Sequence, residues 1–398
     1  MLTEAGCAAD AAGETPPQSA GAAKPLYKMP RRGPLVSGTV LSRPNRFVAS
    51  ALVDGQEAKC YLPNPGRLWE LIYPGAELLL TPSFASTDYT VLGVRRENGE
   101  TVPLHTHRAN DLAAAIVRAG LLPGHEKALV KRREIPVGDS RFDLLLSEDA
   151  RDLYVEVKCC TLFAGGGAYF PDAPSDRACR HVRHLARMAG EGVKTAVLVI
   201  VNSPAPRWFL PDWHTDPDFA RAMLEARGRV EFIPLALGWN ADMVAEGPVR
   251  RLSVPWRTLE REMGERGLCL ALIEREGEFW CSLERSSELT KAMARWSRAR
   301  KAPEGRAEEL RAGGRLLAAV PFRTPEDVFD ALGEDLDAIL ARPCVPDGSR
   351  RLGRFAGDPR RWQPFVQLLL KYRFTRLDPV IGRELDQDEK NCLRAASR

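Results

Sequence analysis

The feature that most constrains this chain is an almost unbroken apolar run, Thr195-Ala196-Val197-Leu198-Val199-Ile200-Val201, without alternation of polar and apolar residues. A strand that alternates has one face in water, whereas a strand that is apolar throughout is buried on both faces. Parallel strands in α/β proteins have this composition because helices cover both faces of their sheet. We therefore expect a layered α/β unit around residues 195–201.

The segments around this run follow helix and strand patterns in a definite order. A helix is predicted from Asn110, a residue type that caps helices, to Gly120, a residue type that ends them. Three strands, a second helix, the apolar strand, a third helix and a last strand follow at residues 129–135, 140–146, 153–158, 175–189, 195–201, 219–227 and 230–237. The order αβββαβ, with one further helix and strand, is assigned to residues 109–245.

A different pattern of short alternating strands and frequent turns covers residues 33–108. Asp54-Gly55 and Glu97-Asn98-Gly99 are hairpin signals, because glycine tolerates the positive φ that tight turns require. About five short strands fit between the turns, at residues 47–53, 58–62, 75–80, 89–94 and 101–105. A small OB-like β-barrel matches this count, and a fragment of a β-sandwich is the alternative.

The two ends of the chain are less regular. Residues 1–32 are rich in Ala, Gly, Pro and Ser and have no helical or strand period, which predicts a disordered tail. Residues 246–398 are left unassigned beyond a mostly helical α/β region. Within it we expect a hairpin around Glu276-Gly277 and helices at residues 287–300, 325–340 and 362–372. The predicted fold class is therefore α/β (α+β).

Composition narrows the class of partner. The net charge of +4 permits nucleic acid as a partner without requiring it. Nine cysteines without a C-x-x-C pair argue against a zinc site and favour reduced thiols. No apolar stretch approaches the ~18 residues that a membrane-spanning helix needs. We expect a cytoplasmic protein without membrane contact, and we leave a homodimer open.

Three charged residues on adjacent predicted strands form the candidate catalytic site. Residues i and i+2 of a strand share a face, so Glu156 and Lys158 project to the same side. The preceding strand, joined by a short loop, can place Asp143 beside them. Two carboxylates and one ammonium group then converge, although a surface strand with alternating charges would have the same spacing.

Such a set can hydrolyse phosphodiesters. Carboxylate oxygens of Asp143 and Glu156 can bind Mg²⁺ or Mn²⁺, with the Val157 carbonyl as a third oxygen. The metal stabilises negative charge that develops on the phosphate. Lys158 can orient the attacking water or neutralise that charge.

Several further motifs, in a fixed order, extend the comparison beyond this site. They are Arg46-Phe47, Pro63-Asn64-Pro65-Gly66-Arg67, Tyr73-Pro74-Gly75-Ala76, Thr106-His107 with Asn110, Ser140-Arg141-Phe142-Asp143, Tyr154-Val155-Glu156-Val157-Lys158, Thr161-Leu162, and Phe170-Pro171-Asp172-Ala173 followed by Arg177 and His181. With these motifs, the chain from about residue 46 to 237 resembles the sugar fermentation stimulation protein A family.

The resemblance implies an OB-like domain followed by a PD-(D/E)xK nuclease-like domain. It also implies DNA binding with little sequence preference, and a nuclease or a regulatory role linked to sugar (maltose) use. The sequence departs from the family pattern at Cys159-Cys160, at Ala178 and at Arg108-Ala109. None of these positions is Asp143, Glu156 or Lys158.

Five residues are the candidate contacts to nucleic acid, although a solvated basic surface is the alternative for the arginines. They are Arg67, Arg141, Arg177, Arg180 and His181. Tyr61 and Tyr89 are candidates for base stacking or for hairpin packing.

Other residues have open roles. Glu134 and Asp172 are either outer acids of the metal site or, respectively, a surface carboxylate and a turn cap. Gly165-Gly166-Gly167 either lets a DNA backbone approach or is an ordinary loop, and His107 and Asn110 are expected to join the two domains.

The first functional hypothesis is a metal-dependent, sequence-tolerant DNA endonuclease. The alternative is a non-catalytic DNA-binding regulator of sugar (maltose) metabolism, for which the nuclease fold is only a platform. Whether the DNA is single or double stranded is left open.

Overall fold

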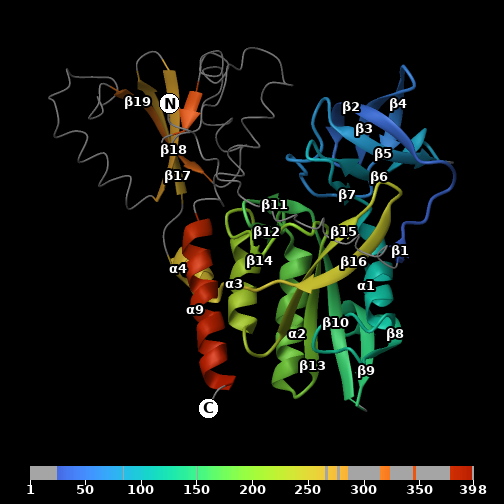
Figure 1. The fold of residues 1–398 in the computed structure, drawn as a ribbon, viewed down its shortest axis with the longest axis vertical. Helices are drawn as coiled ribbons and strands as arrows, with labels where there is room; N and C mark the ends of the chain where they lie inside the picture. Colours follow the sequence, from blue (N-terminus) through green and yellow to red (C-terminus); the bar gives the residue numbers. More distant parts are fainter. Residues whose placement is uncertain are drawn as a thin grey trace, which may run out of the picture.

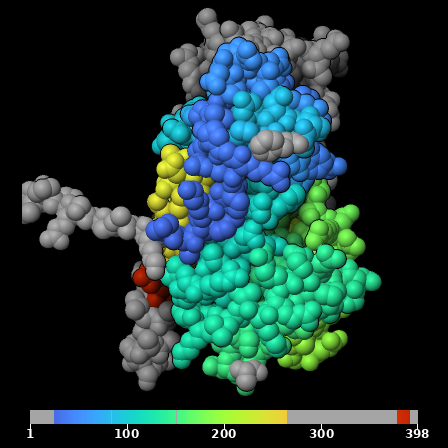
Figure 2. Space-filling model, turned by 90° about the vertical axis from the view of Figure 1, so that its right-hand side faces the viewer, coloured from blue at the N-terminus to red at the C-terminus, as the bar shows by residue number. Residues whose placement is uncertain are grey.

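The structure is a computed structural model that describes residues 25–83, 85–149, 151–264, 268–275, 278–285, 314–322, 344–346 and 377–396. An N-terminal barrel, blue in Figure 1, is joined to a larger α/β domain, which is coloured green to yellow. Figure 2 shows the blue barrel stacked on the teal edge of the α/β domain.

The barrel confirms the OB-like prediction. Its strands are β2 (Val36–Asn45), β3 (Val48–Val53), β4 (Gln56–Tyr61), β5 (Glu77–Pro82), β6 (Tyr89–Arg95) and β7 (Thr101–Pro103). They form a sheet in the order β4-β3-β2-β5-β6-β7, and β4 also pairs with β6. This extra pairing closes β2 to β6 into a barrel whose interior is a single apolar cluster.

The sequence reading missed β2. Its segment, VSGTVLSRPN, buries little side-chain area and contains Gly38, so it lacks apolar alternation. A Cβ at Gly38 would lie 2.8 Å from Leu80 and 2.9 Å from Val53. The strand is therefore defined by close packing against its neighbours rather than by its own hydrophobic pattern.

The α/β domain is built around the predicted apolar strand. The first half of its elements is α1 (Ala109–Arg118), β8 (Leu129–Val137), β9 (Ser140–Glu148), β10 (Arg151–Cys160) and α2 (Asp176–Gly190). They are followed by β13 (Lys194–Val201), α3 (Pro217–Ala226), β15 (Glu231–Trp239) and β16 (Val244–Arg251). This series confirms the αβββαβ prediction.

Strand β13 lies in the middle of the sheet, parallel to both β10 and β15. From Thr195 to Val201 every residue of β13 is buried. Helix α1 packs on one face of the sheet, and α2 and α3 pack on the other, as Figure 1 shows. A small sheet of β11 (Leu162–Ala164), β12 (Gly167–Phe170) and β14 (Trp208–Pro211) lies beside it.

The predicted ends of the domains need correction. Strand β1 (Pro25–Lys28) falls within the predicted tail, yet it pairs with β16 at the edge of the seven-stranded sheet. Met29, also within that prediction, is buried and donates a backbone hydrogen bond to Met243. Residues 1–24 lie outside the described residues. The predicted boundary at residue 245 falls inside β16, so the sheet continues beyond it.

Part of the C-terminal region packs against the α/β domain. Helix α9 (Asp378–Ala396) lies beside α4 (Trp256–Gly264), and Thr258 donates two hydrogen bonds to Glu384. Leu377 and Ile381 enter an apolar cluster with Trp208.

The predicted hairpin of this region is present as β17 (Leu268–Arg275) and β18 (Glu278–Arg285). They form a sheet with β19 (Gly314–Phe322) and β20 (Cys344–Pro346). The helices expected at residues 287–300, 325–340 and 362–372 lie outside the described residues. No described helix is long and apolar enough to cross a membrane.

Candidate active site

The two predicted carboxylates meet where the β9–β10 ladder ends. The antiparallel pairing runs from Arg151 and Glu148 to Val155 and Leu144, and it stops there. Instead of a further ladder bond, the backbone N–H of Val157 donates to Asp143 Oδ2 at 2.7 Å. The carboxylate of Asp143 therefore replaces the backbone carbonyl that a paired strand would offer to the Val157 N–H.

This arrangement bears on the third predicted ligand. In a strand, the N–H and C=O groups of one residue point toward the same neighbour. Since the Val157 N–H faces Asp143, its carbonyl also lies on the edge left open by β9. The carbonyl is thus on the side of the strand where the site lies, and its role as a metal ligand stays a prediction.

Glu156 is the most buried residue of the site, with 2% of its surface exposed. Its Oε1 atom lies 2.6 Å from Lys158 Nζ and 2.5 Å from His181 Nδ1. Its Oε2 atom is also buried and has no hydrogen-bond partner. A buried carboxylate oxygen without a partner is costly, and a bound cation would remove that cost.

The electrostatic environment shifts the pKa values of the two acids in opposite directions. Burial and then the negative charge of Glu156 raise the pKa of Asp143 from 3.8 to about 6. For Glu156, burial raises the pKa, but the hydrogen bond from His181 and the charge of Lys158 outweigh it, so the pKa is lowered. Glu156 is therefore ionised at neutral pH, and Asp143 gains most from a neighbouring cation.

Asn110 belongs to this site, which the sequence reading did not expect. Helix α1 begins at Ala109, so Asn110 lies within its first turn, and the prediction that it caps the helix is wrong. Its Nδ2 atom donates to Asp143 Oδ1 at 2.7 Å and lies 3.3 Å from Glu134 Oε1. Asn110 thus holds the carboxylate of Asp143 from the side opposite Val157.

Glu134 is connected to the site through Asn110. It lies on β8, between residues that pair with Leu144 and Phe142 of β9. Its φ of 53° is in the left-handed region, which is unusual for a residue other than glycine. Through Asn110 it shares a hydrogen-bond donor with Asp143.

The ligand set fits a divalent cation with a partly hydrated shell. Among the described residues, no three His, Cys, Asp or Glu side chains are grouped to hold a metal ion. The protein ligands offered are therefore Asp143, Glu156 and the Val157 carbonyl. Mg²⁺ commonly binds one or two carboxylates and keeps several waters, so this set suits it.

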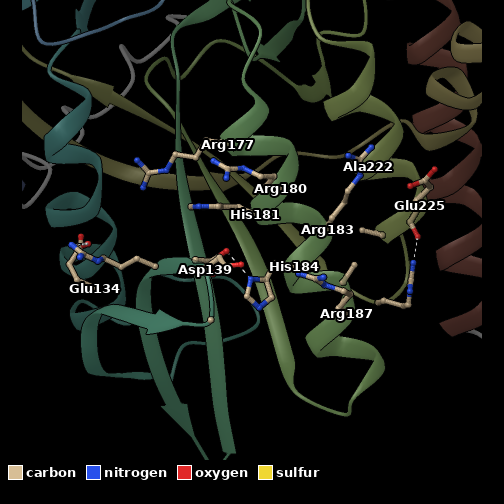
Figure 3. Close-up of a pocket in the computed structure, with 16 residues that line it drawn as sticks. Glu134, Asp139, Arg177, Arg180, His181, Arg183, His184, Arg187, Ala222 and Glu225 are labelled. Atoms are coloured by element: carbon tan, nitrogen blue, oxygen red, sulfur yellow. Dashed lines mark hydrogen bonds and ion pairs between the residues drawn. The ribbon is translucent and has the colours of Figure 1, made fainter.

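A basic cleft of about 1190 Å³, whose lining Figure 3 shows, adjoins the site through Glu134 and His181. Asp143, Glu156 and Lys158 are not among the residues that line it. Four of the predicted contacts to nucleic acid line it: Arg141, Arg177, Arg180 and His181. Arg183, Arg187 and Arg229 add further guanidinium groups, against the acids Glu134, Asp139 and Glu225. With six arginines and three acids, the charged lining has an excess of three positive charges.

Most of these arginines are carried by helix α2. Ser175 caps the helix by accepting a hydrogen bond from the Ala178 N–H. The apolar side of the helix, including Val182 and Leu185, packs on the sheet. The arginines therefore face the solvent, while the buried ring of His181 reaches from the same helix to Glu156.

The remaining candidate, Arg67, lies elsewhere. Its loop packs against Asp172, which accepts a hydrogen bond from the Leu68 N–H at 3.3 Å. A Cβ on Gly66 would lie 2.3 Å from Asp172 Oδ2, so only glycine fits there. Asp172 joins the barrel to the α/β domain, and the positive charge of Arg67 acts on that carboxylate.

The glycine triplet is packed rather than open. A Cβ on Gly165 would lie 2.4 Å from Asp378 Oδ2, and a Cβ on Gly166 would lie 2.4 Å from the Trp208 ring. These contacts support the reading of the triplet as a structural loop and leave no space for a DNA backbone at these two positions. His107, expected at the domain junction, is exposed in the turn before α1.

The fold and the site define a two-domain protein in which an OB-like barrel precedes a PD-(D/E)xK nuclease-like domain. Residues 41–103 match the family described as the SfsA N-terminal OB domain. Residues 107–243 match the Sugar fermentation stimulation protein RE domain.

The chain is also similar to curated proteins named Sugar fermentation stimulation protein homolog. The protein of Methanothermobacter thermautotrophicus is 36% identical over 224 residues, which are 55% of this chain and 93% of the relative. The protein of Moorella thermoacetica is 39% identical over 197 residues, which are 48% of this chain and 84% of the relative. The chain therefore belongs to the sugar fermentation stimulation protein family.

A solved structure agrees with this assignment. The structure of Pyrococcus furiosus SfsA in complex with Ca²⁺ is 30% identical to this chain and superposes with a TM-score of 0.52. The match covers 57% of this chain and 99% of that protein.

Proposed function

We propose that this protein is a DNA-binding phosphodiesterase that requires a divalent metal ion and tolerates many sequences. The observation that carries the proposal is the buried pair Asp143 and Glu156, with one carboxylate oxygen left without a partner beside Lys158. A pair of buried acids destabilises a fold unless a cation neutralises it. The Ca²⁺ in the related Pyrococcus furiosus structure supports a divalent ion, with Mg²⁺ or Mn²⁺ as the ion expected for cleavage.

The basic cleft supports nucleic acid as the ligand. Its guanidinium groups, which include those of Arg177 and Arg180, suit the phosphate oxygens of a nucleic-acid backbone. Contacts of this kind read charge and shape rather than bases, so they favour binding without sequence preference. His181 lines this cleft and contacts Glu156, so a strand bound there would lie one side chain away from the buried acid.

In hydrolysis, a water molecule loses a proton to solvent while its oxygen forms a bond to phosphorus. The ester P–O bond breaks, and the departing sugar oxygen takes up a proton from solvent. A divalent ion at Asp143 and Glu156 would supply positive charge beside the phosphate. The ammonium group of Lys158 is placed to orient the water or to stabilise the added negative charge. His181 and Asn110 hold Glu156 and Asp143 in position.

A plasmid-nicking assay tests this function. With Mg²⁺ or Mn²⁺ we expect the wild-type protein to nick supercoiled DNA, and with EDTA we expect no nicking. Lys158→Ala and Asp143→Ala should each reduce the rate by about 100-fold or more, the usual effect of losing one group that stabilises transition-state charge.

Lys131→Ala is the matched control, because Lys131 is an exposed lysine on strand β8 of the same sheet and pairs with Asp152. This variant should nick DNA at the wild-type rate. Nicking that persists in EDTA, or that is unchanged in Lys158→Ala, would sink the proposed site.

The small number of protein ligands favours a second candidate. A DNA-binding regulator of sugar (maltose) metabolism needs the cleft but not the acids, and among the described residues only Asp143 and Glu156 are buried carboxylates at this site. It predicts salt-dependent, sequence-tolerant binding with no nicking under any metal. Binding that is equal in wild type and Asp143→Ala, together with absent nicking, would favour the regulator.

A further inference from the structure

A second cavity, of about 540 Å³, lies on the barrel where the β1–β2 connection meets the start of α1. Its lining includes Arg31, Arg32, Tyr61, Thr81, His105 and Arg108, together with hydroxyl groups of the β5–β6 loop. Among the described residues that line it, none is acidic. The wall therefore carries three guanidinium groups, and that of Arg108 is also paired through Nη1 with Asp111, which lies outside the wall.

Four buried polar atoms of this wall lack a hydrogen-bond partner among the described residues. They are Arg31 Nη1, Thr81 Oγ1, His105 Nδ1 and Arg108 Nε. Thr81 is only 3% exposed, so water reaches its hydroxyl poorly. Most buried polar groups in proteins are paired, and each exception is unfavourable for stability. Four exceptions around one cavity indicate that a polar ligand completes it.

The unpaired atoms define the chemistry of that ligand. The two arginine nitrogens can only donate, and the threonine hydroxyl can also donate. Burial and the charge of Arg108 lower the pKa of His105 to about 4, so its ring is neutral and adds no charge at neutral pH. A ligand with several acceptor oxygens and a negative charge, such as a phosphate ester, would satisfy these donors together.

We propose that this cavity binds a backbone phosphate of a nucleic-acid strand, separate from the phosphate that faces Asp143 and Glu156. Tyr61, at the rim and 37% exposed, is placed to stack on an adjacent base. Only the choice of nucleic acid as the ligand rests on the proposed function.

The position of Arg108 favours a continuous strand over a free small anion. Arg108 precedes α1 directly, and Asn110, which holds Asp143, lies in the first turn of the same helix. The cavity and the site therefore adjoin the same end of α1. A strand anchored in the cavity is thereby led toward the catalytic acids. The cavity volume also falls within the range of about 300–1,000 Å³ typical of ligand sites, so it has room for a nucleotide unit.

Binding of a fluorescent single-stranded dT12 oligonucleotide, measured by anisotropy in EDTA over a range of salt concentrations, tests the proposal. Arg31→Gln removes one charged donor, and we expect the Kd to rise about tenfold. The slope of log K against log salt should become shallower by about 0.7, the value for one contact to a single strand. Arg118→Gln, which removes an exposed arginine near the end of α1, is the matched control and should change neither quantity.

Thr81→Val separates a binding role from a structural one. Valine has the shape of threonine without the unpaired hydroxyl, so the free protein should melt at the same temperature or higher. The Kd for dT12 should nevertheless rise several-fold. A Thr81→Val protein that binds dT12 as tightly as wild type would overturn the proposal, as would equal effects of Arg31→Gln and Arg118→Gln.

Competition with inorganic phosphate and with dTMP distinguishes the sources of a phosphate. We expect neither to displace dT12 until present in large excess, because a strand adds stacking and further contacts. A dTMP affinity equal to that of dT12, and lost in Thr81→Val, would instead identify a free-nucleotide site and overturn the strand assignment. Because binding is measured in EDTA, a failure of nicking leaves this test unaffected.

Discussion

Replacing Asp143 by asparagine should change stability in a way that depends on pH. Burial and the charge of Glu156 raise the pKa of Asp143 from 3.8 to about 6 in the folded protein. The folded state therefore binds this proton more tightly than the unfolded state. The stability that Asp143 contributes is fully present below pH 3.8 and is lost as the pH rises through about 6.

The size of the effect follows from this shift. One pKa unit corresponds to about 1.36 kcal/mol, so the full amplitude is about 3 kcal/mol. The same linkage gives about 2 kcal/mol over the accessible range from about pH 4.5 to 7.5. Asparagine does not titrate, and it can accept from only one of the two donors, Asn110 and the Val157 N–H. That loss is independent of pH, so it cancels when the two ends of the range are compared.

Urea unfolding in EDTA, followed by tryptophan fluorescence, measures the difference between wild type and Asp143→Asn at each pH. We expect the variant to gain about 2 kcal/mol relative to wild type between about pH 4.5 and 7.5. Asp242→Asn removes an exposed carboxylate and reports the general effect of a lost surface charge. A difference that stays flat for Asp143→Asn would refute the claim that two buried acids oppose each other at this site.

Three further predictions concern other parts of the molecule. Mg²⁺ at about 100 times its Kd should raise the unfolding free energy of wild type by about 2.7 kcal/mol and leave Asp143→Ala unchanged in a thermal-shift titration. Gly66→Ala should destabilise the protein by about 1–3 kcal/mol in urea unfolding, because its Cβ meets Asp172, and should be nearly neutral in an Asp172→Ala background. His125 lies between Glu148 and Glu231; burial lowers its pKa, but those hydrogen bonds outweigh burial and raise it above 6.5. His125→Gln should therefore destabilise more at about pH 6 than at about pH 8.5, since this contribution is lost as pH rises through the raised pKa.

The central sheet could be predicted because its residues carry the pattern of their own burial. The run at residues 195–201 is apolar because helices cover both faces of β13, and no distant information is needed to read it. Strand β2 was missed for the opposite reason. Its residues are set by the space between β3 and β5, so Gly38 is explained only when Leu80 and Val53 are in place.

Part of the site could also be predicted from local patterns. Asp143, Glu156 and Lys158 lie on neighbouring strands, so strand geometry and a short loop bring them together. Asn110 contacts Asp143 across 33 positions of sequence, so local patterns could not reveal the contact. Its residue type suggested only a helix cap. Arg67 was proposed as a nucleic-acid contact because it stands in a proline-glycine loop of the barrel, and that proposal stays a prediction. The contact of its neighbour Gly66 with Asp172 of the other domain could not be predicted, because 106 positions of sequence separate the two residues.

The local irregularities of the α/β domain support a functional reading of the site. The β9–β10 ladder stops short, Glu134 takes a left-handed conformation, and Glu156 buries an oxygen without a partner. Each of these is unfavourable for stability, and strained or unsatisfied groups persist mainly where function requires them. All three lie around Asp143, whose own raised pKa also opposes ionisation. A bound cation would pair with the free oxygen of Glu156 and would also favour the ionised form of Asp143. Metal binding therefore explains more of this geometry than a purely structural role does.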